Sequence, residues 1–134
     1  MIDIDVARRL QQAGLDWDPH DGDRFAVDTE DLRTETFLLS SMVIEAATGR
    51  GGQQVFRFNG TTEWALDSVQ QHETIWLPRE DQLRAALGDV FRELQREADG
   101  TFVVRWAEGD AVREVRAPHA EDAYAGALLV HLGG

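Results

Sequence analysis

The chain of 134 residues contains no cysteine, no lysine and no long apolar run. The lack of cysteine excludes disulfides and thiolate metal sites. The longest apolar runs are far shorter than the roughly 20 residues of a membrane-spanning helix. Residues 1–5 are acidic and have no apolar core, so we expect no signal peptide and a cytoplasmic protein.

The remaining composition is typical of a globular protein. Hydrophobic residues make up 43% of the chain and charged residues 28%. A chain of this length buries roughly 68% of its unfolded surface, so we expect a single domain over residues 1–134. All 13 basic residues are arginines, spread along the chain without a basic block, so arginine usage indicates no particular function.

The strongest feature of the sequence is its negative charge. The net charge is −12, and residues 16–35 carry half of it, with eight acids against two arginines. Such a field repels nucleic acids and anionic membranes and attracts basic partners. The sequence therefore predicts an acidic surface with five candidate residues: Asp16, Asp18, Asp21, Asp23 and Asp31.

Closely spaced acids around Gly22 are also found in calcium-binding loops. Counted from Asp16, however, the glycine falls at the seventh position instead of the sixth, and the twelfth is Val27 instead of glutamate. We therefore expect a solvated acidic loop with no metal, and no cofactor.

Periodicity and turn residues predict an α+β fold, a mainly antiparallel sheet built from hairpins with three to four helices packed on it. The expected helices run from Asp3 or Asp5 to Gly14 and over 63–70, 78–99 and 118–132. The expected strands are 24–27, 36–45, 53–58, 73–76 and a hairpin around Gly109-Asp110.

The helix over residues 78–99 has the clearest periodic signal. Pro78 suits the first helical position, and apolar residues follow with 3–4 spacing. Gly88 inside this helix indicates a close crossing with a neighbouring element. The apolar stripe consists of Leu83, Leu87, Val90, Phe91 and Leu94.

A two-residue turn at Gly109-Asp110 fixes the register of the last hairpin. Trp106 then faces Arg113 on the side that packs inward, with the Arg113 guanidinium stacked on the indole. Arg105 faces Glu114 on the solvated side as an opposite-charge pair. The predicted pairs are Trp106–Arg113, Val104–Val115, Phe102–Ala117, Arg105–Glu114 and Val103–Arg116.

One central segment holds the candidate residues for a ligand or partner site. Glu63 and Asp67 lie four residues apart, so both carboxylates can share a helix face and, with His72, form a metal or acid–base site. The same spacing also fits a solvated helix face. Trp64 and Trp76 can border a groove for a peptide or small ligand, or pack at the rim of the core. The candidates are Asn59, Thr61, Glu63, Trp64, Asp67 and Trp76.

No complete catalytic or phosphate-binding motif is present in the sequence. The serines lack a Gly-x-Ser-x-Gly context, and the glycine cluster at 49–52 lacks the lysine of a phosphate-binding loop. The four histidines fit no zinc spacing. We therefore predict no catalytic residues.

Two stretches of the chain resemble a known group of proteins. Residues 58–69 (FNGTTEWALDSV) and 76–83 (WLPREDQL) are similar to short, acidic, mostly actinobacterial proteins of uncharacterised function, sometimes labelled pilus assembly proteins. The resemblance implies a stand-alone bacterial cytoplasmic domain in which residues 59–67 are important.

These observations together favour a small acidic bacterial domain that acts as a non-enzymatic protein-interaction module and binds a basic partner protein. The alternative is a small-ligand-binding or hydrolytic domain centred on residues 59–67. A self-associating structural subunit is a third hypothesis. None of the three involves nucleic acid or a membrane, and the sequence leaves the partner and the oligomeric state open.

Overall fold

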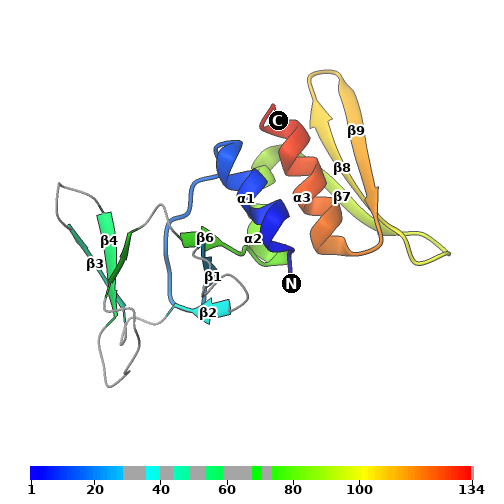
Figure 1. Ribbon diagram of the computed structural model, residues 1–134. Coiled ribbons are helices and arrows are strands. Elements are labelled where there is room, and N and C mark those ends of the chain that lie inside the picture. Colours follow the sequence, from blue (N-terminus) through cyan, green and yellow to red (C-terminus); the bar gives the residue numbers. More distant parts are fainter. Residues whose placement is uncertain (29–35, 40–43, 49–53, 59–67, 71–73, 134) are drawn as a thin grey trace. The chain divides into compact units, whose positions relative to one another are not determined.

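The computed structural model of the chain describes residues 1–28, 36–39, 44–48, 54–58, 68–70 and 74–133 (Figure 1). The chain divides into two compact units. Unit 1 comprises residues 1–16 and 78–134, and unit 2 comprises residues 17–77. The predicted α+β class is confirmed, because helices occur together with antiparallel strand pairs. The single domain over residues 1–134 stays a prediction.

Unit 1 contains all the helices of the described chain. They are α1 (Ile4–Gln12), α2 (Glu80–Leu87), the short 3-10 helix η3 (Gly88–Val90) and α3 (Ala120–His131). The start of α1 is as predicted, because the Asp3 carboxylate accepts a hydrogen bond from the Asp5 amide at 2.8 Å. Its end is also as predicted, since Gly14 follows with φ +104°.

Unit 1 also contains the sheet β7-β8-β9, formed by β7 (Phe91–Arg96), β8 (Phe102–Glu108) and β9 (Ala111–Ala117). The predicted register of the last hairpin is confirmed, with Trp106 opposite Arg113 and Arg105 opposite Glu114. Within the described residues, the Arg113 guanidinium does not stack on the Trp106 indole as predicted. Arg113 instead donates a hydrogen bond to Glu108 at 2.8 Å.

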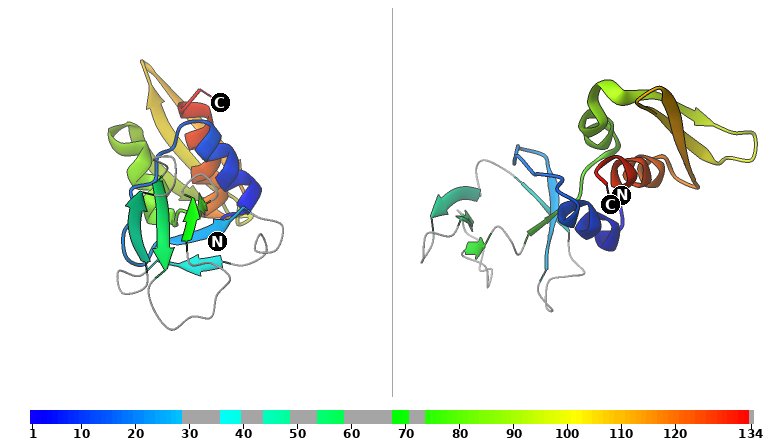
Figure 2. Two further views of the ribbon diagram at one scale, coloured as in Figure 1. Left: turned by 60° about the vertical axis from the view of Figure 1, so that its left-hand side comes forward. Right: turned by 90° about the horizontal axis from the view of Figure 1, so that it is seen from above.

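Helix α3 packs on one face of this sheet (Figures 1 and 2). Val104 and Trp106 on β8 are buried there, together with Tyr124 and Leu128 of α3. The approach is close at Gly126, where a Cβ atom would lie 2.8 Å from Cγ1 of the β9 residue Val115.

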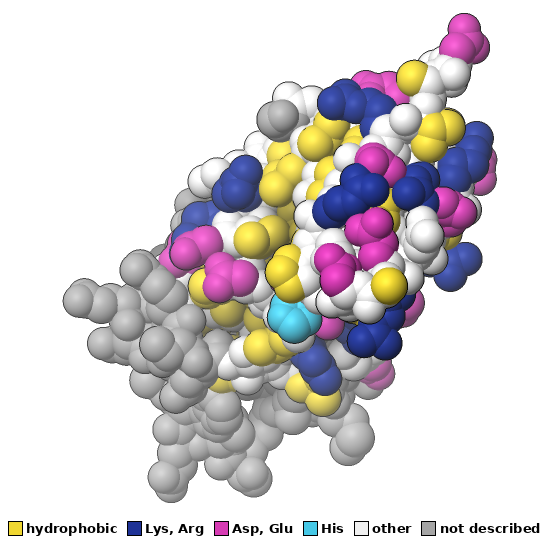
Figure 3. All heavy atoms as spheres, turned by 90° about the vertical axis from the view of Figure 1, so that its right-hand side faces the viewer, with side chains coloured by type: hydrophobic (Ala, Val, Ile, Leu, Met, Phe, Trp, Pro, Cys, Tyr) yellow, Lys and Arg dark blue, Asp and Glu magenta, His cyan; other side chains and the backbone are white. Residues whose placement is uncertain are grey.

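The opposite face of the sheet carries a ladder of charged side chains that crosses all three strands. Arg105, on the central strand, binds Glu93 of β7 and Glu114 of β9. Arg116 of β9 binds both Glu114 and Glu97. Figure 3 shows arginine and acidic side chains interspersed on this side of the molecule. The predicted Arg105–Glu114 pair is therefore present, but the prediction of a wholly solvated face is wrong at Val103, which is buried.

The predicted helix over residues 78–99 is wrong in its second half. Helix α2 begins at Glu80 after the cap residue Arg79 and ends at Leu87, because Gly88 adopts φ +62° and ψ −137°. Gly88 therefore ends the helix instead of allowing a close crossing within it. Residues 91–96 form strand β7, paired with β8.

The predicted helix end at Asp99-Gly100 is instead the turn of the β7–β8 hairpin. The Gly100 amide donates to the Glu97 carbonyl at 2.9 Å, and the Glu97 amide donates to the Thr101 carbonyl at 2.8 Å. The Asp99 carboxylate accepts from the Thr101 amide at 2.9 Å, which lowers the pKa of Asp99.

Unit 2 contains two three-stranded antiparallel sheets. The first has the order β2-β1-β6, formed by β1 (Arg24–Val27), β2 (Thr36–Leu38) and β6 (Thr74–Trp76). Its buried cluster consists of Phe25, Val27, Phe37 and Leu39, with the partly buried Trp17 packed against it. The strands predicted at 24–27 and 73–76 are therefore confirmed, the second beginning one residue later.

The second sheet of unit 2 has the order β3-β4-β5, formed by β3 (Ile44–Thr48), β4 (Gln54–Phe58) and β5 (Ser68–Gln70). The strand predicted at 53–58 is confirmed as β4, and its hairpin partner is β3, with Ile44 opposite Phe58, which overlaps the predicted partner strand only at residues 44 and 45. Two predictions are corrected here. The strand predicted over 36–45 is two strands in different sheets, and the end of the helix predicted over 63–70 is strand β5, which pairs with β4.

Candidate functional site

The loop between residues 16 and 23 is held by a buried carboxylate. The Asp23 side chain accepts a hydrogen bond from the indole Nε1 of Trp17 and another from the backbone amide of His20, each at 2.9 Å. Only 1% of Asp23 is exposed. Asp23 is therefore not part of the predicted acidic surface but the anchor of the loop that carries it.

The backbone ties the same loop to the end of strand β2. The Leu39 amide donates to the Asp23 carbonyl at 2.7 Å, and the Gly22 amide donates to the Leu39 carbonyl at 2.9 Å. The Asp23 amide donates to the His20 carbonyl at 3.1 Å, and Gly22 adopts φ +88° in this turn. These bonds close residues 17–23 into a defined loop.

The closed loop leaves the other described acids of the predicted surface in solvent. The Asp18 side chain is 94% exposed, and Asp16 and Asp21 are exposed as well. His20 contacts Asp18 through both ring nitrogens, with Nδ1 2.7 Å from the Asp18 carbonyl and Nε2 3.9 Å from the carboxylate. Asp31, the fifth predicted acid, lies outside the described residues. An anchored loop that presents several carboxylates can attract a basic surface.

Two aromatic side chains pack against Trp17, the residue that Asp23 holds in this loop. Trp17 stacks on Trp76 with ring centroids 6.4 Å apart and an interplanar angle of 7°, and it also contacts Phe25 at 5.7 Å. Trp76, a predicted site residue, therefore lies against the anchor of the acidic loop. Its indole Nε1 is buried and has no hydrogen-bond partner among the described residues.

The central segment with the other predicted ligand or partner residues lies outside the part of the chain that the structure describes. Asn59, Thr61, Glu63, Trp64 and Asp67 all lie outside the described residues, and so does His72. Within the described part of the chain, no group of three or more His, Cys, Asp or Glu side chains is arranged to hold a metal ion.

Sequence reasoning missed the anchoring role of Asp23 because its signal is weak. Asp23 is one of four aspartates between positions 16 and 23, and nothing in the charge pattern separates it from the others. The one indication in the sequence is that Asp23 directly precedes strand β1, a position at which a side chain can point into the core. The exposed acids, by contrast, could be predicted from charge alone.

Comparison of the chain with known protein families, curated proteins and solved structures gave no match. The resemblance to short acidic actinobacterial proteins therefore stays a prediction. No helix in the described residues combines the length and the apolar character that crossing a membrane requires.

Proposed function

We propose that this protein is a non-enzymatic binding module whose acidic loop, residues 16–23, docks onto a basic surface of a partner protein. The observation that carries the proposal is the buried Asp23 carboxylate, which holds the Trp17 indole and the His20 amide. Because these bonds anchor the loop, its backbone need not be ordered on binding, and this lowers the entropic cost of association.

The charge of the whole chain supports the same function. A net charge of −12 speeds the approach of a cationic partner and repels nucleic acids. The partner is expected to present clustered arginine or lysine side chains, which pair with Asp18 and Asp21 at the exposed rim of the loop.

The proposal is tested by two double variants of equal charge. Asp18→Asn/Asp21→Asn neutralises the loop, and Asp89→Asn/Asp110→Asn neutralises two exposed acids of unit 1. Each variant has a net charge of −10, so long-range attraction changes equally. Binding of a nona-arginine peptide, measured by calorimetry at about 0.05 M salt, should weaken more for the loop variant.

An equal loss of affinity in the two variants would show that only the overall charge matters. That result would contradict a defined site on the loop. Pull-down with the parent and the loop variant from a bacterial lysate, read by mass spectrometry, then identifies proteins whose capture depends on Asp18 and Asp21.

A further inference from the structure

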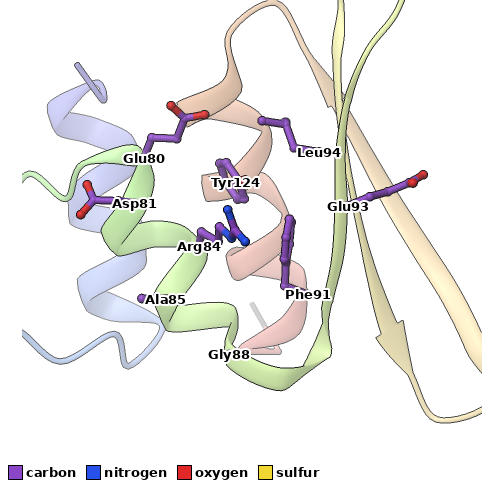
Figure 4. Close-up of a pocket in the computed structure, with 9 residues that line it drawn as sticks. All are labelled: Glu80, Asp81, Arg84, Ala85, Gly88, Phe91, Glu93, Leu94 and Tyr124. Carbon is purple, nitrogen blue, oxygen red and sulfur yellow. The ribbon is translucent and has the colours of Figure 1, made fainter.

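Unit 1 contains an open hollow of about 870 Å³ between α2, β7 and α3 (Figure 4). Its size lies in the range of small-molecule sites. The hollow lies in unit 1, whereas residues 17–23 of the acidic loop belong to unit 2, so the hollow shares no residue with the site of the proposed function.

The apolar part of the hollow is formed by two aromatic rings. Phe91 of β7 and Tyr124 of α3 lie with their ring centroids 5.7 Å apart at an angle of 40°. Tyr124 is 2% exposed, whereas Phe91 is half-buried and Leu94, on the same strand, is 36% exposed. Burial of an apolar ligand group against Phe91 and Leu94 would remove this surface from water.

Arg84 of α2 reaches into the hollow. Its guanidinium carbon lies 4.9 Å from the centroid of the Phe91 ring, and Figure 4 shows the side chain directed toward Phe91 and Tyr124. No carboxylate of the described residues lies within 4.0 Å of this guanidinium. Stacking on a ring leaves the N–H donors at the edge of the guanidinium free to bind a carboxylate.

Glu80 lies one helical turn before Arg84 on the same side of α2. Glutamate and arginine at positions i and i+4 in this order can form an ion pair on a helix surface. Here the pair is open, because Arg84 is turned toward Phe91. Glu80 likewise has no ion-pair partner in the part of the chain that the structure describes.

The other two charged residues that line the hollow form ion pairs with residues outside its lining. Asp81 binds Arg79 at 3.2 Å, and Glu93 binds Arg105 on the opposite face of the sheet. Figure 4 shows both carboxylates pointing away from the aromatic rings. One positive and one negative charge therefore remain at the hollow, a helical turn apart.

The two charges also act on the buried side chain of Tyr124. Burial raises the pKa of Tyr124, with a smaller raising effect from Glu80 and a lowering effect from Arg84. Both charges therefore lie close enough to the Tyr124 phenol to affect its pKa.

We propose that this hollow binds the zwitterion of an apolar α-amino acid. The carboxylate of the ligand pairs with Arg84, its ammonium group pairs with Glu80, and its side chain packs on Phe91 and Leu94. A zwitterion matches both open charges, whereas a ligand of one sign would be repelled by one of them.

The first test compares three probes on the full chain by NMR titration. L-Phenylalanine carries both charges, N-acetyl-L-phenylalanine lacks the ammonium group, and L-phenylalaninamide lacks the carboxylate. L-Phenylalanine should shift the signals of Phe91 and Tyr124, and each derivative should bind about tenfold more weakly or worse. Equal binding of either derivative, or no shift at about 20 mM L-phenylalanine, overturns the proposal.

The second test uses variants with matched controls. Arg84→Gln and Glu80→Gln should each weaken L-phenylalanine binding about tenfold. Arg113→Gln and Glu108→Gln make the same changes at the hairpin, away from the hollow, and should leave binding unchanged. All four of these residues are exposed, so all four variants should fold. Unchanged binding in Arg84→Gln overturns the proposal, whatever happens to the acidic loop.

Discussion

At the scale of single residues, Asp23 shows how burial changes the role of a charged side chain. Its neighbours Asp18 and Asp21 are exposed, whereas Asp23 accepts two hydrogen bonds in the interior of unit 2. A buried carboxylate is tolerated when its oxygens are hydrogen-bonded. The same residue type therefore serves the surface at one position and the core at another.

Replacing Asp23 with alanine should destabilise unit 2. The Trp17 indole N–H and the His20 amide would lose their acceptor, at a cost of about 2 kcal/mol. Urea unfolding followed by tryptophan fluorescence measures this change. Asp18→Ala removes an exposed carboxylate and should change stability by less than about 0.5 kcal/mol. Equal destabilisation by the two substitutions would contradict the anchoring role.

Gly126 is a second residue whose role depends on close packing. An alanine there would place its Cβ 2.8 Å from Cγ1 of Val115. The helix propensity of alanine favours the substitution by about 1 kcal/mol, but overpacking costs about 1–3 kcal/mol. Because Val115 is β-branched and has few alternative rotamers, we expect Gly126→Ala to destabilise the protein.

The matched test for Gly126 is a double-mutant cycle. Val115→Ala removes the methyl group that would clash, so Gly126→Ala should be less harmful, or even stabilising, in that background. Denaturation midpoints of the four proteins measure the coupling. Additive effects would show that the contact does not limit the approach of α3 to the sheet.

At the scale of elements, the region after Leu87 explains why one prediction failed. Leu83 and Leu87 lie on a helix, but Phe91 and Leu94 lie on a strand and share a face although they are three residues apart. The reason is the register shift in β7, where Phe91 pairs with Trp106 and Leu94 pairs with Val104. The β-bulge therefore gives two apolar residues of a strand the three-residue spacing that is typical of a helix.

Gly88 marks the boundary between helix and strand. An alanine substitution there is expected to raise the stability of the predicted long helix but to lower the stability of the observed fold. In the predicted long helix, alanine would stabilise by about 1 kcal/mol. In the observed fold, φ +62° and ψ −137° suit glycine only, so Gly88→Ala should destabilise by roughly 2 kcal/mol. Thermal unfolding decides between the two. Ala86→Gly, inside α2, controls for propensity and should cost about 1 kcal/mol.

The charged ladder on the sheet predicts a dependence of stability on pH. Hydrogen bonds from Arg116, and then from Arg105, lower the pKa of Glu114 below its ordinary value of 4.5. A carboxylate with a lowered pKa contributes stability above its ordinary pKa, and this contribution disappears as pH falls through the folded value. Glu114→Gln should therefore lose less stability than the parent on acidification below pH 4.5.

Salt provides the control for the ladder, because its charges are exposed. At about 1 M salt the Debye length is near 3 Å, and the parent and Glu114→Gln should then show similar acid profiles. Urea denaturation from neutral pH to below the ordinary pKa measures both profiles. Identical profiles at low salt would show that the charge of Glu114 does not contribute to stability.

The elements that could be predicted share one property: the residues that indicate each element lie within or directly beside it in the sequence. The Gly109-Asp110 turn and the alternation around it fixed the last hairpin, and Asp3 and Gly14 fixed α1. What could not be predicted depends on contacts distant in sequence. The open Glu80–Arg84 pair, for example, requires Phe91 and Tyr124, which only the packing of β7 and α3 brings to α2.

At the scale of the whole molecule, both ends of the chain contribute to unit 1, and unit 2 lies between them in sequence. Unit 1 has fourteen acids and nine arginines, a net charge of −5, and unit 2 has eleven acids and four arginines, a net charge of −7. The excess negative charge is thus concentrated in the unit that carries most of the acidic loop. Each unit also has its own buried residues, around Phe25 in unit 2 and around Trp106 in unit 1.

Separate cores predict separate opening free energies in hydrogen exchange. Asp23→Ala should speed amide exchange in β1, β2 and β6 and leave β8 and α3 unchanged, whereas Gly126→Ala should do the reverse. The parent chain, measured under the same conditions, gives the reference rates. If either substitution instead accelerates exchange in both sets of elements by the same factor, the chain opens as one cooperative body. That outcome would favour the single domain predicted from the sequence, since a single core transmits a local loss of packing to every element that it holds.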